Sequence, residues 1–188
     1  MHLATDTVDA LEFMVELANT TAGASRSATD ELATPEELVH LVARHLYSGR
    51  IDGDDAELGE VRRFRARLRQ VWSLDRDSMV EAINLMLREA QAVPYLARHD
   101  GLDWHLHATS PEAPLAERMS VEAALALSDV VRMDAVDRLR VCDAPDCEGL
   151  LADLSRNGSK RFCTIRCANR VNMIAFRARK QERGLAVR

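Results

Sequence analysis

Residues 142–167 read CDAPDCEGLLADLSRNGSKRFCTIRC, and this stretch decides the fold because it holds all four cysteines of the 188-residue chain. The cysteines form two close pairs, Cys142-x4-Cys147 and Cys163-x3-Cys167, which fifteen residues separate. Two short segments that each supply two thiolates can converge on one ion, as a tetrahedral metal site requires. Zinc suits four soft thiolates best. The spacing therefore predicts one structural Zn²⁺ ion with a closed shell of four cysteines.

Two other uses of these cysteines remain as alternatives. Disulfides form in oxidising compartments, but the N-terminal sequence MHLATDTVDA lacks the basic and apolar segments of a secretory signal. An iron–sulfur cluster also takes thiolate ligands and is the main competitor of zinc. No apolar run approaches the roughly 18 residues that a membrane-spanning helix needs. We therefore expect a cytoplasmic protein with reduced cysteines and no membrane association.

The charges of the chain are unevenly distributed, although its formal net charge is only −5. Residues 1–141 contain 15 basic and 25 acidic residues, whereas residues 142–188 contain ten basic and five acidic ones. A zinc ion with four thiolates would remove two units of charge and still leave this tail positive. An acidic body with a basic tail predicts that the tail binds a polyanion, most often nucleic acid. A basic terminus that is merely solvated is the alternative.

Residues 1–140 show mainly helical periodicity. The pattern Thr34-Pro35-Glu36-Glu37 is a capping box with proline at the first helical position, and it predicts a helix that ends at Gly49. Ser78–Glu81 is a second capping box and predicts the start of another helix. A long helix is expected from Leu115 to Arg140, directly before the first cysteine.

An acidic turn at residues 52–55 precedes a further helix with two distinct faces. The apolar face carries Val61, Phe64, Leu68 and Val71, and the arginines that we expect to face solvent are Arg62, Arg65 and Arg69. The turn itself has some of the acidic spacing of a calcium loop, but Glu57 stands where that loop needs glycine. We expect no calcium site.

One β-hairpin interrupts the helical pattern. Residues 92–98 and 102–108 flank His99-Asp100-Gly101, in which the Asp-Gly pair favours a tight turn. His105 and His107 lie on one face of the second strand and could share a metal, but no third ligand is nearby, so a solvated face is expected. No nucleophile–base pattern accompanies any histidine or aspartate, and we therefore expect no enzyme.

The segment between the cysteine pairs predicts how the metal-binding module is built. Asn157-Gly158 is a two-residue hairpin signal. After it, Cys163 and Cys167 stand four residues apart, close to one face of a predicted helix. A short loop with the first two cysteines (the knuckle), then a hairpin, then a helix is the order of a treble-clef-like zinc finger.

The final helix also has two distinct faces. At 100° per residue, one arc of about 100° holds five polar or basic side chains, namely Arg166, Asn169, Arg170, Arg177 and Lys180. The opposite side carries small and aliphatic residues from Ala168 to Ala178, which should pack the helix on the finger or the body. Arginine can follow a phosphate backbone and contact guanine, and asparagine can read adenine. Further backbone contacts are expected from Arg156, Lys160 and Arg161.

Three segments of the tail resemble the CGNR zinc finger, namely Cys142-x4-Cys147, Asp153–Cys163 and Cys167-Ala-Asn-Arg170. The preceding body, with its Leu17-Ala-Asn19-Thr20 helix end and the Leu-rich helix before Cys142, is similar to the ABATE domain. That domain precedes this finger in bacterial stress-induced transcriptional regulators. The resemblance implies four cysteine ligands to zinc and a DNA-binding function. Ala168 stands where the family has its name-giving glycine, and Phe162 stands where tryptophan is usual. Alanine is the better helix former, so the fold should tolerate the first change.

The sequence thus predicts a mainly α protein. A helical N-terminal domain with one β-hairpin spans residues 1–140, and a small treble-clef-like four-cysteine zinc finger with a basic C-terminal helix spans residues 141–188. We expect a zinc-dependent DNA-binding transcriptional regulator whose N-terminal domain senses a signal or dimerises. A small-molecule effector and a homodimer both stay open. The alternative is a zinc-stabilised protein-interaction or RNA-binding module without sequence-specific DNA recognition, although the finger has few aromatic residues for stacking on RNA.

Overall fold

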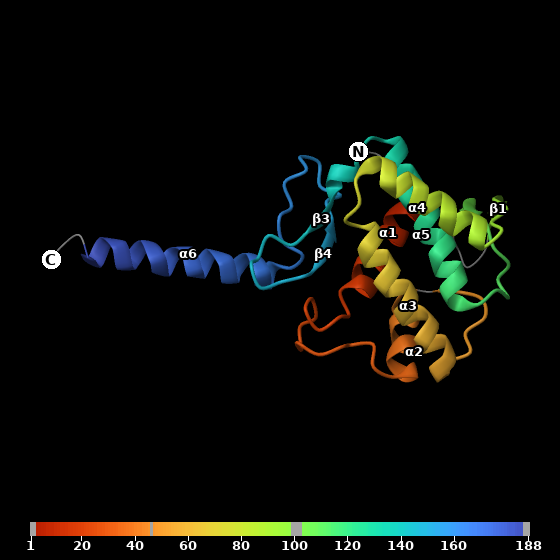
Figure 1. Cartoon of the computed structure of the whole chain (residues 1–188), viewed down its shortest axis with the longest axis horizontal. Coiled ribbons are helices and arrows are strands. Elements are labelled where there is room, and N and C mark those ends of the chain that lie inside the picture. The colour runs from red at the N-terminus through yellow and green to blue at the C-terminus, as the bar shows by residue number, and fades with distance from the viewer. Residues whose placement is uncertain (1–2, 46, 99–102, 186–188) are drawn as a thin grey trace.

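The chain forms a rounded helical body, a small cysteine-containing finger and one long helix that projects from the finger (Figure 1). A computed structural model describes residues 3–45, 47–98 and 103–185, with side chains as far as Gln181. Its elements are α1 (Thr5–Ala18), α2 (Pro35–Arg44), α3 (Asp55–Val71), α4 (Arg76–Glu89), β1 (Tyr95–Ala97), β2 (His105–His107), α5 (Leu115–Arg132), the 3-10 turn η1 (Val136–Arg138), β3 (Leu139–Val141), β4 (Leu150–Ala152) and α6 (Ile165–Leu185).

The core of the body lies around α5, which packs against α1, α3 and α4. Leu11, Leu17, Leu68 and Leu127 are fully buried in this core. Strand β4 packs against α1, and its Leu150 belongs to the same core. The predicted mainly α architecture is confirmed, and the finger shares a core with the body.

Helix α2 begins as predicted. The Thr34 Oγ1 atom accepts a hydrogen bond from the Glu37 backbone at 3.4 Å, and the Glu37 carboxylate accepts one from the Thr34 backbone at 3.1 Å. The helix ends at Arg44 rather than at Gly49. The chain turns away at His45, whose ring lies 2.7 Å from the Glu16 carboxylate on α1. This contact with a distant helix ends α2 before the glycine.

Helix α4 begins earlier than predicted, because its cap is Asp75 and not Ser78. The Asp75 carboxylate accepts hydrogen bonds from the backbones of Asp77 and Ser78 at 3.1 and 3.0 Å. The Ser78 hydroxyl itself donates to Asp75 at 2.8 Å. An ionised carboxylate satisfies the free N–H groups and also interacts with the helix dipole, so it takes the capping position.

The long helix predicted from Leu115 to Arg140 was wrong over its last eight residues. Helix α5 ends at Arg132, and Asp134 adopts a positive φ of 53°, which a continuing right-handed helix does not allow. The chain then forms η1 and strand β3. Leu139 therefore pairs with Ala152 in a sheet instead of extending a helix.

The predicted β-hairpin of the body is confirmed. Strands β1 and β2 are antiparallel, with Tyr95 opposite His107 and Ala97 opposite His105. The predicted turn at residues 99–101 lies outside the described residues. The two histidine Nε2 atoms are 2.8 Å apart on one face of β2, as the spacing indicated.

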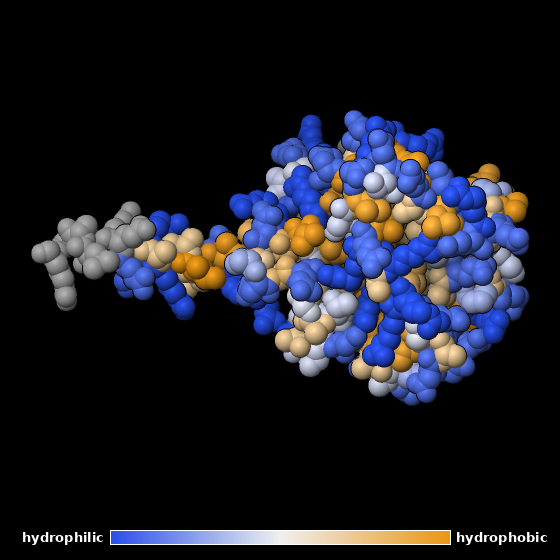
Figure 2. Space-filling view, in the orientation of Figure 1, coloured by the Kyte–Doolittle hydropathy of each residue, from blue (hydrophilic) through white to orange (hydrophobic). Residues whose placement is uncertain are grey.

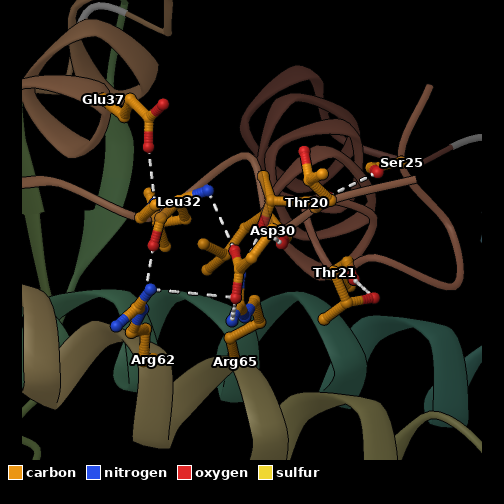
Figure 3. Close-up of polar contacts among 12 residues, drawn as sticks. Thr20, Thr21, Ser25, Asp30, Leu32, Glu37, Arg62 and Arg65 are labelled. Carbon is orange, nitrogen blue, oxygen red and sulfur yellow. Dashed lines mark hydrogen bonds and ion pairs between the residues drawn. The ribbon is translucent and has the colours of Figure 1, made fainter. Parts of the chain in front are cut away.

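The arginines of α3 do not simply face solvent, as the sequence led us to expect. The Arg65 side chain is 8% exposed, and its guanidinium donates two hydrogen bonds of 2.7 Å to Asp30 and one of 2.7 Å to the Thr20 hydroxyl (Figure 3). Arg62 donates to the Leu32 carbonyl at 2.8 Å. The hydrogen bonds from Arg65 hold the pKa of Asp30 below its usual range. The segment between α1 and α2 is thereby fastened to α3.

This fastened segment, residues 19–34, is also where the body contacts the finger. The Gly23 carbonyl accepts a hydrogen bond from the Glu148 backbone at 3.0 Å. Farther along, the Arg26 carbonyl accepts one from the Arg166 guanidinium at 3.0 Å. The polar network of Figure 3 therefore positions a surface on which the finger rests.

Candidate metal centre and the projecting helix

The first cysteine pair lies in the loop of the β3–β4 hairpin. Strand β3 pairs with β4 through Val141 opposite Leu150, so the two strand ends present Cys142 and Cys147 side by side. The Cys142 N–H donates to the Gly149 carbonyl at 2.7 Å, and the Cys147 N–H donates to the Ala144 carbonyl at 3.1 Å. These backbone bonds shape the loop that carries the first two thiols.

The hairpin predicted at Asn157-Gly158 was wrong. Of these two residues only Gly158 has a positive φ, and the strand before it pairs with β3 rather than with a strand after it. The connection to α6 is organised instead by Asp153, which is fully buried. Its carboxylate accepts hydrogen bonds from Ser155 and from the Lys160 backbone. A buried carboxylate with several donors fixes this loop without a strand pair.

The second cysteine pair meets the first: Cys163 lies in the bend before α6, and Cys167 lies in the first turn of α6. The sulfur of Cys163 lies 3.6 Å from that of Cys147 and 3.7 Å from that of Cys167, and the sulfurs of Cys167 and Cys147 are 3.7 Å apart. All four sulfur atoms lie within 4.8 Å of one another. A tetrahedron of sulfurs around Zn²⁺ has edges of about 3.8 Å, since zinc–thiolate bonds are about 2.3 Å. The donor set and its spacing therefore fit a tetrahedral metal ion.

The surroundings of two of the thiols disfavour their ionised form. Burial and the neighbouring thiols Cys147 and Cys142 raise the pKa of Cys163 far above its usual range. Burial likewise raises the pKa of Cys147. Four thiolates cannot share so small a volume unless a cation balances them, and a bound metal ion displaces the thiol protons. This chemistry favours a site that is filled by a divalent cation.

Gly149 lies closest to the sulfur cluster. A Cβ atom at this position would be 2.6 Å from the Cys163 sulfur and 3.2 Å from the Cys147 sulfur. The Gly149 N–H also donates to the Cys147 sulfur at 3.4 Å. The knuckle therefore requires glycine here because the backbone approaches the metal ligands directly.

Replacing Gly149 by alanine is expected to weaken zinc binding by about 10-fold to 100-fold, as losses in the shell around metal ligands usually do. A competition titration with a chromogenic chelator measures this affinity. The matched control is Gly59→Ala on α3, where the new Cβ would meet only the tip of Arg63 at 3.5 Å. The control should keep the native affinity. Equal affinities for Gly149→Ala and Gly59→Ala would contradict the role given to Gly149.

The finger is docked on the body by side chains that bind backbone groups. Asn19, at the end of α1, donates to the Leu150 carbonyl at 2.9 Å and accepts from the Leu150 N–H at 2.7 Å. Arg69 of α3 donates to the carbonyls of Ala18 and Glu148 at 2.8 and 2.7 Å. The amide of Asn19 thus replaces a neighbouring strand along the free edge of β4. These contacts link the metal centre to two helices of the body.

Helix α6 leaves the metal centre and extends away from the body (Figures 1 and 2). Ala168 and Val171 are partly buried at its base, where Val171 packs against the cysteine cluster. Beyond this point the predicted packing face is uncovered, and Ile174 is 54% exposed. The expectation that the small residues pack the whole helix on the finger or the body was wrong. Only the first two turns find a partner among the described residues.

The predicted nucleic-acid contacts divide into two groups. Three of them are engaged within the protein: Arg161 with Asp143 at 2.7 Å, Arg166 with the Arg26 carbonyl, and Arg170 with Asp146 at 2.8 Å. Five have no side-chain partner within the described part of the chain, namely Arg156, Lys160, Asn169, Arg177 and Lys180. The outer half of α6 therefore carries two of these available cations, Arg177 and Lys180, together with the exposed Arg179.

Two family models match the sequence. The CGNR zinc finger matches residues 138–180, and ABATE, described as "Putative stress-induced transcription regulator", matches residues 11–141, more than half of the chain. The chain belongs to the ABATE family. The name of its finger family implies zinc as the ion that the four cysteines hold. No curated protein matches the sequence of this ABATE protein.

The finger match begins at residue 138, and it therefore includes strand β3 of the ABATE protein. This agrees with the pairing of β3 and β4 around the first cysteine pair. Among the described residues, no helix combines the length and the apolarity that a bilayer span would require.

Sequence reasoning missed three residues that support the metal centre of this ABATE protein. Gly149 had a signal, since a glycine two residues after a cysteine pair suits a tight knuckle. Asp153 had one as well, because Asp-x-Ser favours a side-chain turn. Asn19 had none, because its partner is 131 residues away in the sequence.

Proposed function

We propose that this protein is a zinc-stabilised DNA-binding transcriptional regulator, in which one Zn²⁺ ion held by the four cysteines orients α6 toward DNA. The observation that carries the proposal is the free outer half of α6. Arg177, Arg179 and Lys180 are exposed there, and no acidic residue occurs from Thr164 to Gln181. A solvated helix ordinarily mixes charges of both signs, whereas a helix that binds phosphates does not.

The dimensions of α6 support a groove-binding role. A helix with side chains is about 10–12 Å wide, and the major groove of DNA is about 12 Å wide. The 21 residues of α6 extend for about 30 Å at 1.5 Å per residue. The metal centre anchors only its first turns, so most of this length can enter a groove without leaving a packed interface.

The two groups of basic residues have different parts in this proposal. Arg166 and Arg170 brace the base of α6 against the body and the knuckle. Arg177 and Lys180 supply the phosphate and base contacts, and Arg156 and Lys160 follow the backbone from the loop before α6. The four protein ligands close the metal shell and leave no position for a reactive water, so we propose no catalytic activity. The proposed site of action is the cytoplasm, where thiols stay reduced.

A DNA titration at several salt concentrations tests this function. For the zinc-loaded chain, the slope of log affinity against log salt should be about −0.9 per contacted phosphate. The double variant Arg177→Ala/Lys180→Ala should reduce this slope by about two phosphate contacts. The matched control Arg63→Ala/Arg88→Ala removes the same charge from exposed positions on α3 and α4, and it should leave the slope unchanged.

The same titration separates the rival functions. Equal slopes for the two double variants would show that α6 is not the DNA-facing surface. Tighter binding of single-stranded RNA than of duplex DNA would favour the RNA-binding alternative. If no nucleic acid binds even at low salt, the exposed Met173, Ile174 and Phe176 of α6 favour a protein-interaction module.

A further inference from the structure

The helical body contains a large cavity on the side of α1 that carries Thr7 and Phe13. Its volume is about 1080 Å³, slightly above the range of about 300–1,000 Å³ that is usual for small-molecule sites. Helices α1 and α5 form two of its walls, the end of α2 forms a third, and the β1–β2 hairpin covers it. His105 and His107, which the sequence suggested would face solvent, line this cavity.

Aromatic rings form much of the cavity wall. Phe13 and Tyr47 lie with their ring centroids 5.2 Å apart, and Tyr95 stacks on His107 at 5.9 Å. Trp104 of the hairpin segment also lines the cavity and is 64% exposed. Rings that meet from different elements form flat apolar faces, which suit a planar ligand and can hold a cation over the π-system.

The arginines at the cavity are already engaged by the protein. Arg118 donates to the carbonyls of Ser48, Arg50 and Ala113, so all three of its nitrogens have acceptors. Arg44 pairs with Glu16. Arg132 pairs with Asp129 at 3.1 Å. None of these guanidinium groups is placed to receive an anionic ligand as its main partner.

Carboxylates outnumber these cations around the same space. The acidic residues that line the cavity are Asp6, Asp9, Glu12, Glu122 and Asp129. Glu122 lies beside the Tyr47 hydroxyl, and burial together with this charge raises the pKa of Tyr47 well above its usual range. The phenol therefore stays neutral, and the cavity keeps the negative field of its carboxylates.

We propose that this cavity binds an organic cation with a flat apolar body, with Glu122 facing the positive charge and Trp104 and Tyr95 stacking on the planar part. Carboxylates attract the positive charge, and aromatic faces remove the apolar body of the ligand from water. Binding itself does not depend on DNA. Only its use as a signal rests on the proposed regulatory function.

The position of the cavity suggests how binding would be transmitted. Thr7 and Phe13 of α1 line it, and the same helix ends at Asn19, which holds Leu150 of the finger. A ligand that shifts α1 would therefore move the strand edge to which the metal centre is attached. Helix α1 is therefore one direct link between the cavity and the finger.

Two xanthene dyes of opposite charge test the binding step on the full zinc-loaded chain by fluorescence anisotropy. Rhodamine 6G is a cation, and fluorescein is an anion with the same xanthene core. We expect one rhodamine 6G per chain and binding of fluorescein that is weaker by at least about tenfold. Glu122→Gln should weaken rhodamine binding by about tenfold, the loss expected when one charge-assisted contact is removed. Trp104→Ala, at an exposed position that the core does not need, should weaken it by about threefold to tenfold.

The matched control is Glu81→Gln, which removes the same charge from an exposed position on α4 outside the cavity. It should bind rhodamine 6G as the native chain does. Equal binding of the two dyes, absence of rhodamine binding, or the same loss in Glu81→Gln as in Glu122→Gln would each overturn the proposal. No DNA enters this assay, so its outcome is independent of the DNA titration.

Discussion

Replacing Cys163 by serine is expected to remove zinc and to unfold the finger, while the helices of the body persist. The Cys163 sulfur lies within 3.7 Å of those of Cys147 and Cys167, as a ligand of the same ion must. Structural zinc sites supply on the order of 10–16 kcal/mol of apparent binding free energy to small fingers, far more than a module of this size gains from its core. Zinc content per chain and hydrogen exchange along β3, β4 and α6 measure the outcome.

The rest of α6 should fray in the same variant. Its outer turns contact nothing among the described residues, and an isolated helix of this length is only marginally stable in water. Thr164→Ser, next to the ligand, is the matched control and should keep one zinc per chain. Removal of zinc from the native chain by a strong chelator should reproduce the exchange pattern of Cys163→Ser. A Cys163→Ser chain that retained stoichiometric zinc would contradict the four-ligand site.

Replacing Asp30 by asparagine is expected to lower the free energy of unfolding by about 2 kcal/mol. Breaking a buried ion pair leaves one charge uncompensated, which costs about 3–5 kcal/mol when both groups are enclosed. The Arg65 side chain is 8% exposed, but Asp30 keeps 34% of its side chain in water, so the smaller value applies. Urea denaturation followed by circular dichroism measures the change.

Two further variants serve as controls for the stability loss expected in Asp30→Asn. Asp52→Asn breaks the exposed Arg50–Asp52 pair and should leave stability unchanged within error. The double variant Asp30→Asn/Arg65→Leu removes both charges and should recover part of the loss, because no unpaired guanidinium remains. A double variant less stable than Asp30→Asn would show that Arg65 acts through its other contact, the Thr20 hydroxyl.

The same pair predicts a pH dependence. The pKa of Asp30 is lowered in the folded chain, chiefly by hydrogen bonds from Arg65, whereas an aspartate in the unfolded chain has a pKa of about 3.9. Its contribution is therefore complete above that value and is lost as the pH falls through the lower folded pKa. The stability difference between native chain and Asp30→Asn should shrink over this acidic window. A difference that stayed constant there would contradict the pairing.

The sequence predicted features whose causes are local. The capping box at Thr34–Glu37, the β1–β2 hairpin and the convergence of four cysteines each depend on residues within one short stretch of sequence. The outward orientation assigned to Arg65 failed because its partner, Asp30, is 35 residues away and periodicity carries no information about it. Helical periodicity gives the direction of each side chain around the helix axis, but it does not identify the segment against which that side chain packs.

The candidate metal site likewise combines features with local causes and features that depend on residues distant in the sequence. Its ligands followed from spacing, but the pairing of β3 with β4 did not, because the Leu115–Arg140 segment reads as one continuous helix until Asp134 takes a left-handed conformation. The cations of α6 could be named from the sequence. That Arg166 and Arg170 are engaged by the protein could not, because their partners, the Arg26 carbonyl and Asp146, belong to other segments.

The amide bridge from Asn19 to Leu150 has a consequence for how this finger can be separated or transplanted. A fragment cut at Cys142 loses the strand that pairs with β4, and a fragment cut at residue 138 still loses the amide that covers the other edge. Either cut leaves strand edges open to association with another chain. The finger is therefore not an interchangeable module, and a chimera would have to carry the end of α1 along with the cysteines.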